Sequence, residues 1–336
     1  VAERVAPATQ SDDDLERPLV FLYTAKRLTH AVIVVWAVAT VVFFIVRLVP
    51  GGPVTALLGA EYSPQAAQAI EERLGLDDPI YVQYLKYLDH LVHLDLGVSI
   101  AGGADVTAVL VEAFPRTASL TVVGLVLGLL FAIPLGVRAA RSSSKFWGPL
   151  ASTVGLVGLS LPTFWLGMLL ILLVGVRLQA LPAYGYEPLA AGFWPWLSHV
   201  LLPGACLGLW YAAPLVLITR SSMLETLREP FIQTARAKGL SDSVIVVKHV
   251  LPNAFIPVLT MAGIQTGALL SGAVVTEILF AINGIGRVLV SAIHNRDYPV
   301  IQGVILLISV IFVLVNMLVD VLYAVLNPRI RLASEA

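Results

Sequence analysis

Residues 229–252 read EPFIQTARAKGLSDSVIVVKHVLP, a polar and basic stretch between two long apolar segments. Pro230 suits the first position of a helix, where a missing N–H costs nothing. Gly239 suits the left-handed residue that follows a helix end, and Ser241 can cap a second helix. The stretch therefore predicts a short helix, a glycine turn and a second helix that returns to the apolar part of the chain.

The composition around this stretch is that of an integral membrane protein. The chain has 336 residues, of which 58% are hydrophobic and 13% charged, whereas soluble domains carry about 25% charged residues. A helix needs about 20 apolar residues to cross a bilayer core of about 30 Å. The fold class expected is all-α with six transmembrane helices, at residues 28–48, 117–137, 149–176, 198–219, 254–280 and 299–326.

The distribution of Lys and Arg predicts how these spans are oriented, because cytoplasmic loops carry an excess of both. A cytoplasmic N-terminus places 14 of the 21 Lys and Arg residues on that side, and the short segment 138–147 has three basic residues and no acidic one. Both termini and residues 229–252 are therefore expected in the cytoplasm. The predicted parts are a disordered tail, a first span with an outer helical loop, a five-helix membrane domain and a second tail, at residues 1–25, 26–112, 113–327 and 328–336.

The outer segment after the first span is long enough to contain helices of its own. Ser63 and Pro64 can start a helix that ends at Gly75, and Asp78 and Pro79 can start another that ends near Gly97. Apolar and aromatic side chains follow the second helix at helical spacing. We interpret this loop as an amphipathic cap, which either receives a soluble partner or shields the membrane helices.

Two patterns in the sequence could indicate an enzyme or a metal site. Ser160 lies inside the third span, and an intramembrane serine protease would need a histidine base within about 3 Å of it. The nearest histidine in the sequence pattern, His199, lies at the far end of the fourth span, about 15 Å away in depth at 1.5 Å per residue, so a protease is disfavoured. A metal site is the second alternative, at the outer-loop residues Asp89, His90, His93 and Asp95, but such a cluster is more often a solvated face, so we predict no metal.

Ionisable residues within membrane helices are candidates for function. The spans contain two acidic ones, Glu277 near one end of the fifth and Asp320 near one end of the sixth, a turn after Asn316. We take these three residues as candidates for a translocation path. None of them is expected near the middle of the membrane, where a proton-coupled carrier would need such a group.

The chain has no P-loop, which requires a Gly-Lys pair at the start of a helix. Its five lysines follow Ala25, Leu85, Ser144, Ala237 and Val247. We therefore expect no nucleotide or other cofactor to bind this chain, and energy from ATP would have to come from another subunit.

Residues 229–252 resemble the cytoplasmic loop of ABC importer permeases, whose pattern is Glu-Ala-Ala, three residues, Gly, nine residues and Ile-x-Leu-Pro. Ala235, Gly239 and the pair Leu251-Pro252 match this pattern, whereas the Glu, the second Ala and the Ile do not. Motifs along the rest of the chain are similar to the dipeptide, oligopeptide and nickel branch, and the long first outer loop to its B-type permease. Examples are Arg47-Leu-Val-Pro-Gly-Gly-Pro, Leu161-Pro-Thr-Phe-Trp-Leu-Gly and Asn295-Arg-Asp-Tyr-Pro-Val.

The resemblance implies a type I ABC importer permease, a non-enzymatic pore subunit in the bacterial inner membrane. Its partners would be a second permease, two ATPase subunits that bind ATP and Mg²⁺, and an extracytoplasmic binding protein for dipeptides or oligopeptides. Nickel or another small ligand remains an alternative substrate. Phe231, Ile232 and Ala235 are expected to form the apolar face that docks on an ATPase. The coupling residues are Pro230, Phe231, Ile232, Gln233, Thr234, Ala235, Arg236, Ala237, Lys238, Gly239, Leu251 and Pro252.

Overall fold

The computed structural model describes residues 12–48, 54, 58, 63–142 and 144–326. Over these residues the secondary structure is helical, apart from one isolated bridge between Val98 and Asp105. The longer helices are α1 (Asp12–Leu48), α3 (Pro64–Leu74), α4 (Ile80–Val92), α5 (Val106–Arg141), α6 (Trp147–Ser160), α7 (Thr163–Leu170), α8 (Phe193–Thr226), α9 (Pro230–Ala237), α11 (Leu251–Leu279), α12 (Ile285–His294) and α13 (Tyr298–Leu326). The shorter ones are η2 (Ile171–Arg177), η3 (Leu189–Ala191), α10 (Asp242–Val244) and η4 (Ile245–Val250).

Several of these helices can cross a membrane. Within the described ranges, 5 are long and apolar enough, and the number rises to 6 if α6 and the continuous α7–η2 helix are one bent crossing. The predicted all-α membrane fold is confirmed.

The third span, expected over 149–176, is sharply bent in the structure. The chain bends by 106° between α6 and α7, where Leu161 and Pro162 have extended backbone with ψ of 128° and 134°. Proline has no N–H to continue a helix, and its ring pushes the preceding residue out of helical conformation. Pro162 therefore breaks this span, whereas Pro134, Pro203 and Pro214 remain inside continuous helices.

Helix boundaries differ from the predicted ones in places where polar residues extend a helix. Helix α1 begins at Asp12, so residues 12–25 are helical rather than part of a disordered tail, and acidic residues at a helix start are favourable for its dipole. Helix α5 begins at Val106 because the Asp105 carboxylate accepts a hydrogen bond from the Ala108 N–H at 2.9 Å. Residues 1–11 and 327–336 lie outside the described part of the chain.

The outer loop contains the two predicted helices, α3 and α4. Helix α4 ends at Val92, before the predicted end near Gly97. Leu94 then takes a φ of 59°, and the Asp95 carboxylate accepts a hydrogen bond from the Gly97 N–H at 2.8 Å. An aspartate that bonds the backbone two residues later stabilises a turn, and this turn ends the helical run.

Helices α5 and α8 pack closely through glycines. A Cβ atom placed on Gly128 would lie 2.6 Å from Tyr211 Cδ1 and 2.9 Å from the Gly208 carbonyl oxygen. A Cβ atom on Gly208 would in turn lie 2.8 Å from the Gly124 carbonyl oxygen. Small residues let membrane helices approach to backbone contact, so these glycines fix how the two longest buried helices cross. We did not predict this contact, although the four-residue spacing of Gly124 and Gly128 is a known signal for it.

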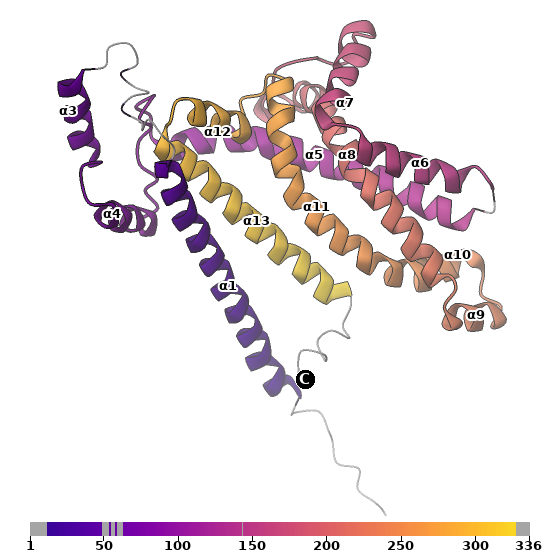
Figure 1. The fold of residues 1–336 in the computed structure, drawn as a ribbon. Helices are drawn as coiled ribbons and strands as arrows, with labels where there is room; N and C mark the ends of the chain where they lie inside the picture. Colours follow the sequence, from indigo (N-terminus) through magenta and orange to yellow (C-terminus); the bar gives the residue numbers. More distant parts are fainter. Residues whose placement is uncertain (1–11, 49–53, 55–57, 59–62, 143, 327–336) are drawn as a thin grey trace, which may run out of the picture.

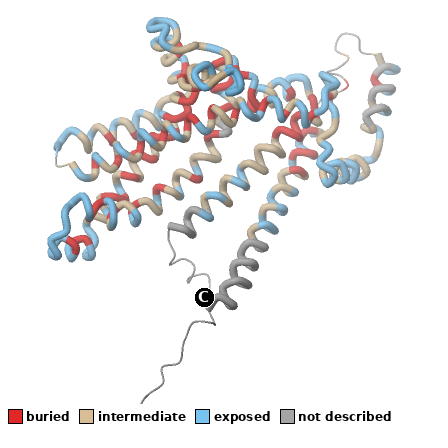
Figure 2. Tube along the Cα trace, turned by 180° about the vertical axis from the view of Figure 1, so that it is seen from behind, coloured by how far each residue is buried: buried red, intermediate tan, exposed pale blue. Residues whose placement is uncertain are grey.

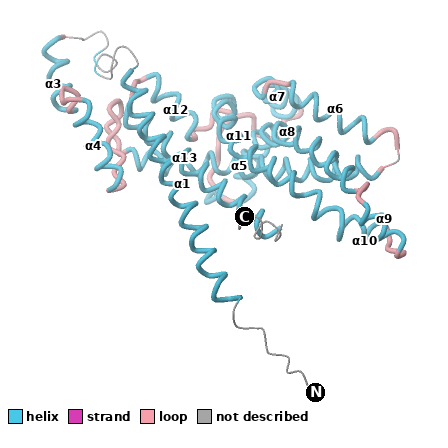
Figure 3. Tube along the Cα trace, turned by 60° about the horizontal axis from the view of Figure 1, so that its bottom comes forward, coloured by secondary structure: helices cyan, strands magenta, loops and turns pink. Residues whose placement is uncertain are grey.

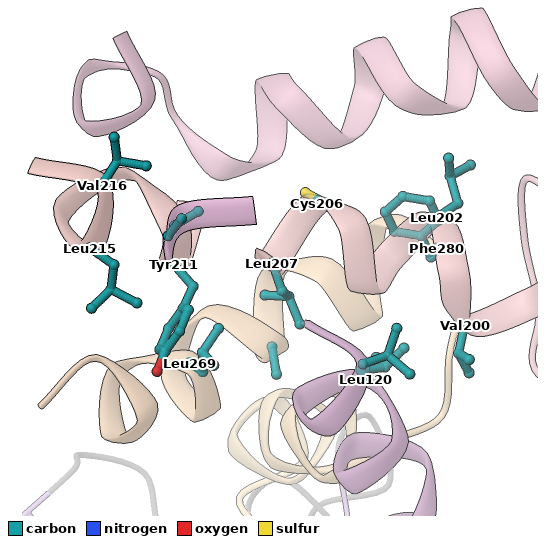
Figure 4. Packing of buried hydrophobic residues seen from close by; sticks show 14 of the residues in the cluster. Leu120, Val200, Leu202, Cys206, Leu207, Tyr211, Leu215, Val216, Leu269 and Phe280 are labelled. Carbon is teal, nitrogen blue, oxygen red and sulfur yellow. The ribbon is translucent and has the colours of Figure 1, made fainter. Parts of the chain in front are cut away.

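The core lies around the middle of α8. Tyr211, Leu207 and Phe280 are among its fully buried side chains, and Figure 4 shows them between the backbones of α5, α8 and α11. The Tyr211 hydroxyl donates a hydrogen bond to the Ala262 carbonyl oxygen of α11 at 3.1 Å. This bond satisfies a polar group that would otherwise be costly inside a membrane.

The short helices outside the bundle gather at two opposite ends of the molecule (Figure 1). Helices α1 and α13 lie side by side, and α3 and α4 project beyond one end of them. Helices α9 and α10 lie at the far end of α8 and α11, on the opposite side of the molecule, as a second view also shows (Figure 3). The two loop structures are therefore separated by the helical bundle.

Candidate functional site

The first candidate site is the segment 229–252, which we call the elbow. Glu229 has extended backbone, Pro230 begins α9, and Gly239 follows the helix with a φ of +78°. The Gly239 N–H donates to the Arg236 carbonyl oxygen at 2.9 Å, and the Leu240 N–H donates to the Ala235 carbonyl oxygen at 3.3 Å. This pair of bonds is the Schellman arrangement, which favours glycine at the left-handed position. The predicted short helix and glycine turn are confirmed.

The second arm of the elbow differs in detail from the prediction. Ser241 lies at the cap position before α10, but its side chain makes no capping hydrogen bond, and the Ile245 N–H bonds instead to the Ser241 backbone carbonyl at 3.0 Å. A π-helical stretch, η4, then leads into α11, whose first residues are Leu251 and Pro252. The chain thus returns from α9 to a membrane helix without an irregular loop.

Apolar residues on the inner side of the elbow attach it to the rest of the chain. Ile232 is fully buried and Ala235 is 8% exposed, in a cluster with residues of α8, η4 and α11. The other buried members are Met223, Ile245, Val246, Val250 and Ala254. Our expectation that Ile232 and Ala235 face a partner protein is therefore wrong: helical periodicity identifies an apolar face but not what covers it.

The outer side of the elbow is exposed. Phe231 is 43% exposed and Leu240 is 39% exposed, and the polar residues around them, Gln233, Thr234, Arg236 and Lys238, are exposed as well. Figure 2 shows this distribution as pale blue on the outside of the elbow and red within. Phe231 and its polar neighbours are therefore accessible to a partner, while Ile232 and Ala235 pack against residues of α8, η4 and α11.

Glu277 lies in an internal network at the junction of α11 and α12. One of its carboxylate oxygens accepts a hydrogen bond from the Thr117 hydroxyl at 2.5 Å, and the other accepts from the Arg287 N–H at 2.9 Å. The Thr117 hydroxyl accepts from the Ile285 N–H at 2.8 Å. Glu277 is fully buried, so in this structure it joins α5, α11 and α12. Its role in a translocation path stays a prediction.

The other two path candidates lie on α13. The Asn316 side-chain amide donates to the Phe312 carbonyl oxygen of its own helix at 2.8 Å. Asp320 lies one turn further along α13, and its side chain falls outside the described residues. For these two residues as well, the path remains a prediction.

The residues behind the protease and metal alternatives, Ser160 and the outer-loop histidines, make other hydrogen bonds in the structure. The Ser160 hydroxyl donates to the Leu156 carbonyl oxygen at 2.8 Å, whereas His199 Nδ1 bonds to the Pro195 carbonyl oxygen at 2.8 Å. His90 Nδ1 pairs with the Asp95 carboxylate at 2.8 Å. Within the described residues there is no group of three or more His, Cys, Asp or Glu placed to hold a metal ion.

A second anchoring network, which we did not predict, lies at the opposite end of the molecule from the elbow. Asp297, between α12 and α13, is 4% exposed. Its carboxylate accepts hydrogen bonds from the Ser99 hydroxyl at 2.5 Å, the Ile100 N–H at 3.1 Å and the Ala101 N–H at 3.3 Å. The turn before α5 is thereby attached to the start of α13.

Comparison with known proteins agrees with this architecture. The family described as the inner membrane component of binding-protein-dependent transport systems matches residues 132–332, and its N-terminal part matches residues 20–121. The inward-facing MetNI methionine ABC transporter has a chain with the same fold, at a TM-score of 0.53 and 18% identity, over 65% of this chain and 96% of that one. The chain therefore belongs to the family of binding-protein-dependent transport system inner membrane components.

Curated relatives place it further within this family. It is 38% identical, over 92% of this chain and 99% of the relative, to the dipeptide transport system permease protein DppB of Alkalihalophilus pseudofirmus. It is 40% identical, over 92% and 98%, to the glutathione transport system permease protein GsiC of Salmonella paratyphi A. The resemblance to DppB-like permeases of ABC importers is confirmed.

Proposed function

We propose that this chain forms half of the translocation pathway of an ATP-driven importer for dipeptides or oligopeptides. The relatives named for dipeptide and glutathione transport support a peptide substrate. A binding protein outside the membrane would deliver the peptide, and a second permease would supply the other half of the pathway. The chain itself would have no catalytic activity.

The elbow is the site through which ATP hydrolysis would act on the pathway. Phe231 and its polar neighbours form the exposed contact for an ATPase subunit, and the buried Ile232 and Ala235 attach the same short helix to α8 and α11. Because packed helices move as units, a displacement of α9 would carry both membrane helices with it. This division of α9 into an exposed face and an attached face is the observation that carries the proposal.

The proposal also fixes the location and partners of the chain. It would lie in the bacterial inner membrane with both termini and the elbow in the cytoplasm, as the excess of Lys and Arg on that side indicates. Two ATPase subunits would bind ATP and Mg²⁺. Under mild detergent, the full-length chain should co-purify with both ATPases and a second permease, and their absence would contradict the proposed assembly.

Substitution of Phe231 by Asp tests the coupling role. Loss of a central aromatic contact typically weakens an interface by tenfold or more, so we expect uptake into proteoliposomes to fall by about tenfold. Because Phe231 is 43% exposed, the variant should still fold and insert. Phe146→Asp is the matched control, since Phe146 is 60% exposed in the link between α5 and α6 and lies outside the elbow.

The substrate is tested separately, on the partner binding protein. Peptides and nickel are compared side by side by calorimetry, and a peptide is expected to bind. Tight nickel binding without peptide binding would replace the proposed substrate and leave the coupling role of the elbow untouched. Unchanged uptake in Phe231→Asp would instead contradict that coupling role.

A further inference from the structure

A cavity of about 220 Å³ lies between α4, the turn that follows it and the first turns of α13. Helix α4 contributes Tyr87 and His90 to its walls, the turn contributes Asp95 and Leu96, and α13 contributes Gln302. These residues are far from the elbow, and nothing in the proposed coupling role uses them.

Two hydrogen-bonding groups in this wall have no protein partner. Tyr87 Oη and Gln302 Nε2 are both buried, and across the described ranges neither has a hydrogen-bond partner. The Gln302 residue is only 8% exposed. Buried polar groups in folded proteins are nearly always bonded, so two such groups on one cavity indicate a place for a ligand.

The hydrogen-bonding groups of the cavity wall favour a ligand with an uncharged hydrogen-bond acceptor. The Gln302 amide nitrogen can only donate, and burial raises the pKa of Tyr87 to about 12, so its phenol stays protonated and can donate too. The Asp95 carboxylate already accepts from His90 Nδ1 and from the Gly97 N–H, each at 2.8 Å. Leu91, Leu96, Pro299 and two glycines complete the lining. A carbonyl oxygen within an otherwise apolar group fits this combination of groups.

The cavity lies at one end of two membrane helices. The Tyr87 ring packs on Phe43 at 5.3 Å between centroids, and Gln83 accepts from Arg47 Nε at 3.1 Å. Both contacts reach the last turns of the apolar run Arg27–Leu48 of α1. Gln302 is four residues into α13, about 6 Å below the helix start. The part of α13 that is apolar enough to cross a membrane begins at Tyr298, so Gln302 lies near its end, where we expect the boundary between the hydrocarbon core and the ester groups of the phospholipids.

The exposed side of α4 suits the same location. Tyr81 is 66% exposed, Leu85 62% and Val92 80%, while charged residues such as Lys86 and Asp89 share the helix. A helix with an apolar side, a polar side and several tyrosines is typical of one that lies in the membrane interface.

We propose that this cavity binds the glycerol-ester region of a phospholipid. The ester carbonyl oxygens accept hydrogen bonds from Tyr87 Oη and Gln302 Nε2. The acyl chains lie along the exposed apolar side chains of α1 and α4.

The test compares two lipids that differ only in the proposed acceptors. The full-length chain is purified in detergent, stripped of lipid and titrated with diacyl phosphatidylcholine or with its dialkyl ether analogue, which lacks the carbonyls. The melting temperature is followed. The diacyl lipid is expected to stabilise the protein at about tenfold lower concentration, the effect of one or two hydrogen bonds.

Variants connect this difference to the cavity. In Tyr87→Phe/Gln302→Leu the two lipids should become equivalent, whereas Tyr184→Phe/Gln65→Leu, at exposed positions of the loop before α8 and of α3, should behave as the unmodified chain. Equal response to both lipids in the unmodified chain, or an unchanged preference in the cavity variant, overturns the proposal. It is also overturned if a water-soluble amide, N-acetylglycinamide, stabilises the lipid-free protein through the same two residues, since the ligand is then a solute.

Discussion

The Ser99 hydroxyl donates a hydrogen bond of 2.5 Å to the carboxylate of Asp297, although the two residues are 198 positions apart in the sequence. Together with the Ile100 and Ala101 N–H groups, this bond attaches the outer loop to the corner between α12 and α13. The loop that carries α4 is thus connected at its C-terminal end to a membrane helix. A displacement of the loop should therefore also displace that helix, and the reverse.

Asp297→Asn should release this turn. Asparagine keeps the size of the side chain but replaces one acceptor oxygen by an NH₂ group, which cannot accept from the N–H groups it would face. Losing one or two buried hydrogen bonds to a charged group costs roughly 1.5–3 kcal/mol each, so amide exchange at Ile100 and Ala101 should be at least tenfold faster. Hydrogen exchange followed by mass spectrometry measures this.

Asp105→Asn is the control for that measurement. Asp105 accepts a single local hydrogen bond at the start of α5, and Asn caps a helix about as well as Asp. Equal exchange rates in the two variants would mean that Asp297 does not hold the turn.

Gly128→Ala should destabilise the contact between α5 and α8. The added methyl group would lie 2.9 Å from a backbone oxygen of Gly208, and overpacking of this kind typically costs about 1–3 kcal/mol. The apparent melting temperature of the protein in detergent should fall.

Gly272→Ala provides the comparison, because a Cβ atom there meets nothing closer than Leu207 Cδ2 at 3.6 Å. Replacing an unobstructed helical glycine by alanine is neutral or stabilising by up to about 1 kcal/mol. If both variants melt alike, the close approach of α5 and α8 is not what makes Gly128 necessary.

Thr117→Val should disrupt the network around Glu277. It removes the hydroxyl that donates to the Glu277 carboxylate and accepts from the Ile285 N–H. Leaving buried groups without partners costs about 1–3 kcal/mol, so thermal unfolding should occur at a lower temperature. Thr226→Val should have a smaller effect, since the Thr226 hydroxyl bonds only to the Ser222 carbonyl oxygen of its own helix, and equal effects would argue against a special role for the network.

Gly239→Ala should strain the elbow without a steric clash. A Cβ atom at Gly239 meets nothing within 4 Å, but the φ of +78° is unfavourable for alanine by roughly 1–2 kcal/mol. We expect ATP-driven uptake to decrease while the amount of inserted protein stays the same. Gly239→Asn should restore much of the uptake, because asparagine tolerates this backbone conformation; if Ala and Asn behave alike, the turn geometry is not what coupling requires.

The elbow shows what could be predicted and what could not. Pro230 and Gly239 determine the start and end of α9 through local backbone chemistry, so the sequence predicts that helix well. The partner of Ile232 is decided by packing against residues of α8 and α11, which no local pattern reveals. The same holds for Asp297, which appears in a quoted motif but gains its role only from residues in a loop far away along the chain.

For the third span, the apolar segment was predicted correctly, but the sharp bend within it was not. Hydropathy identifies residues 149–176 as apolar enough to cross a membrane, and Pro162 indicates a kink. Neither signal gives the size of the bend, because proline can also remain inside a continuous helix, as Pro203 and Pro214 do in α8.

The bend between α6 and α7 also bears on how the protein enters the membrane during synthesis. Helix α6 has 14 residues and is about 21 Å long, which is too short to cross a hydrocarbon core of about 30 Å. It lies against α8, where a Cβ atom on Gly158 would be 2.7 Å from Ala213 Cβ. We therefore expect α6 to remain at the insertion machinery until the ribosome has completed α8, so that the two helices partition into lipid as a pair.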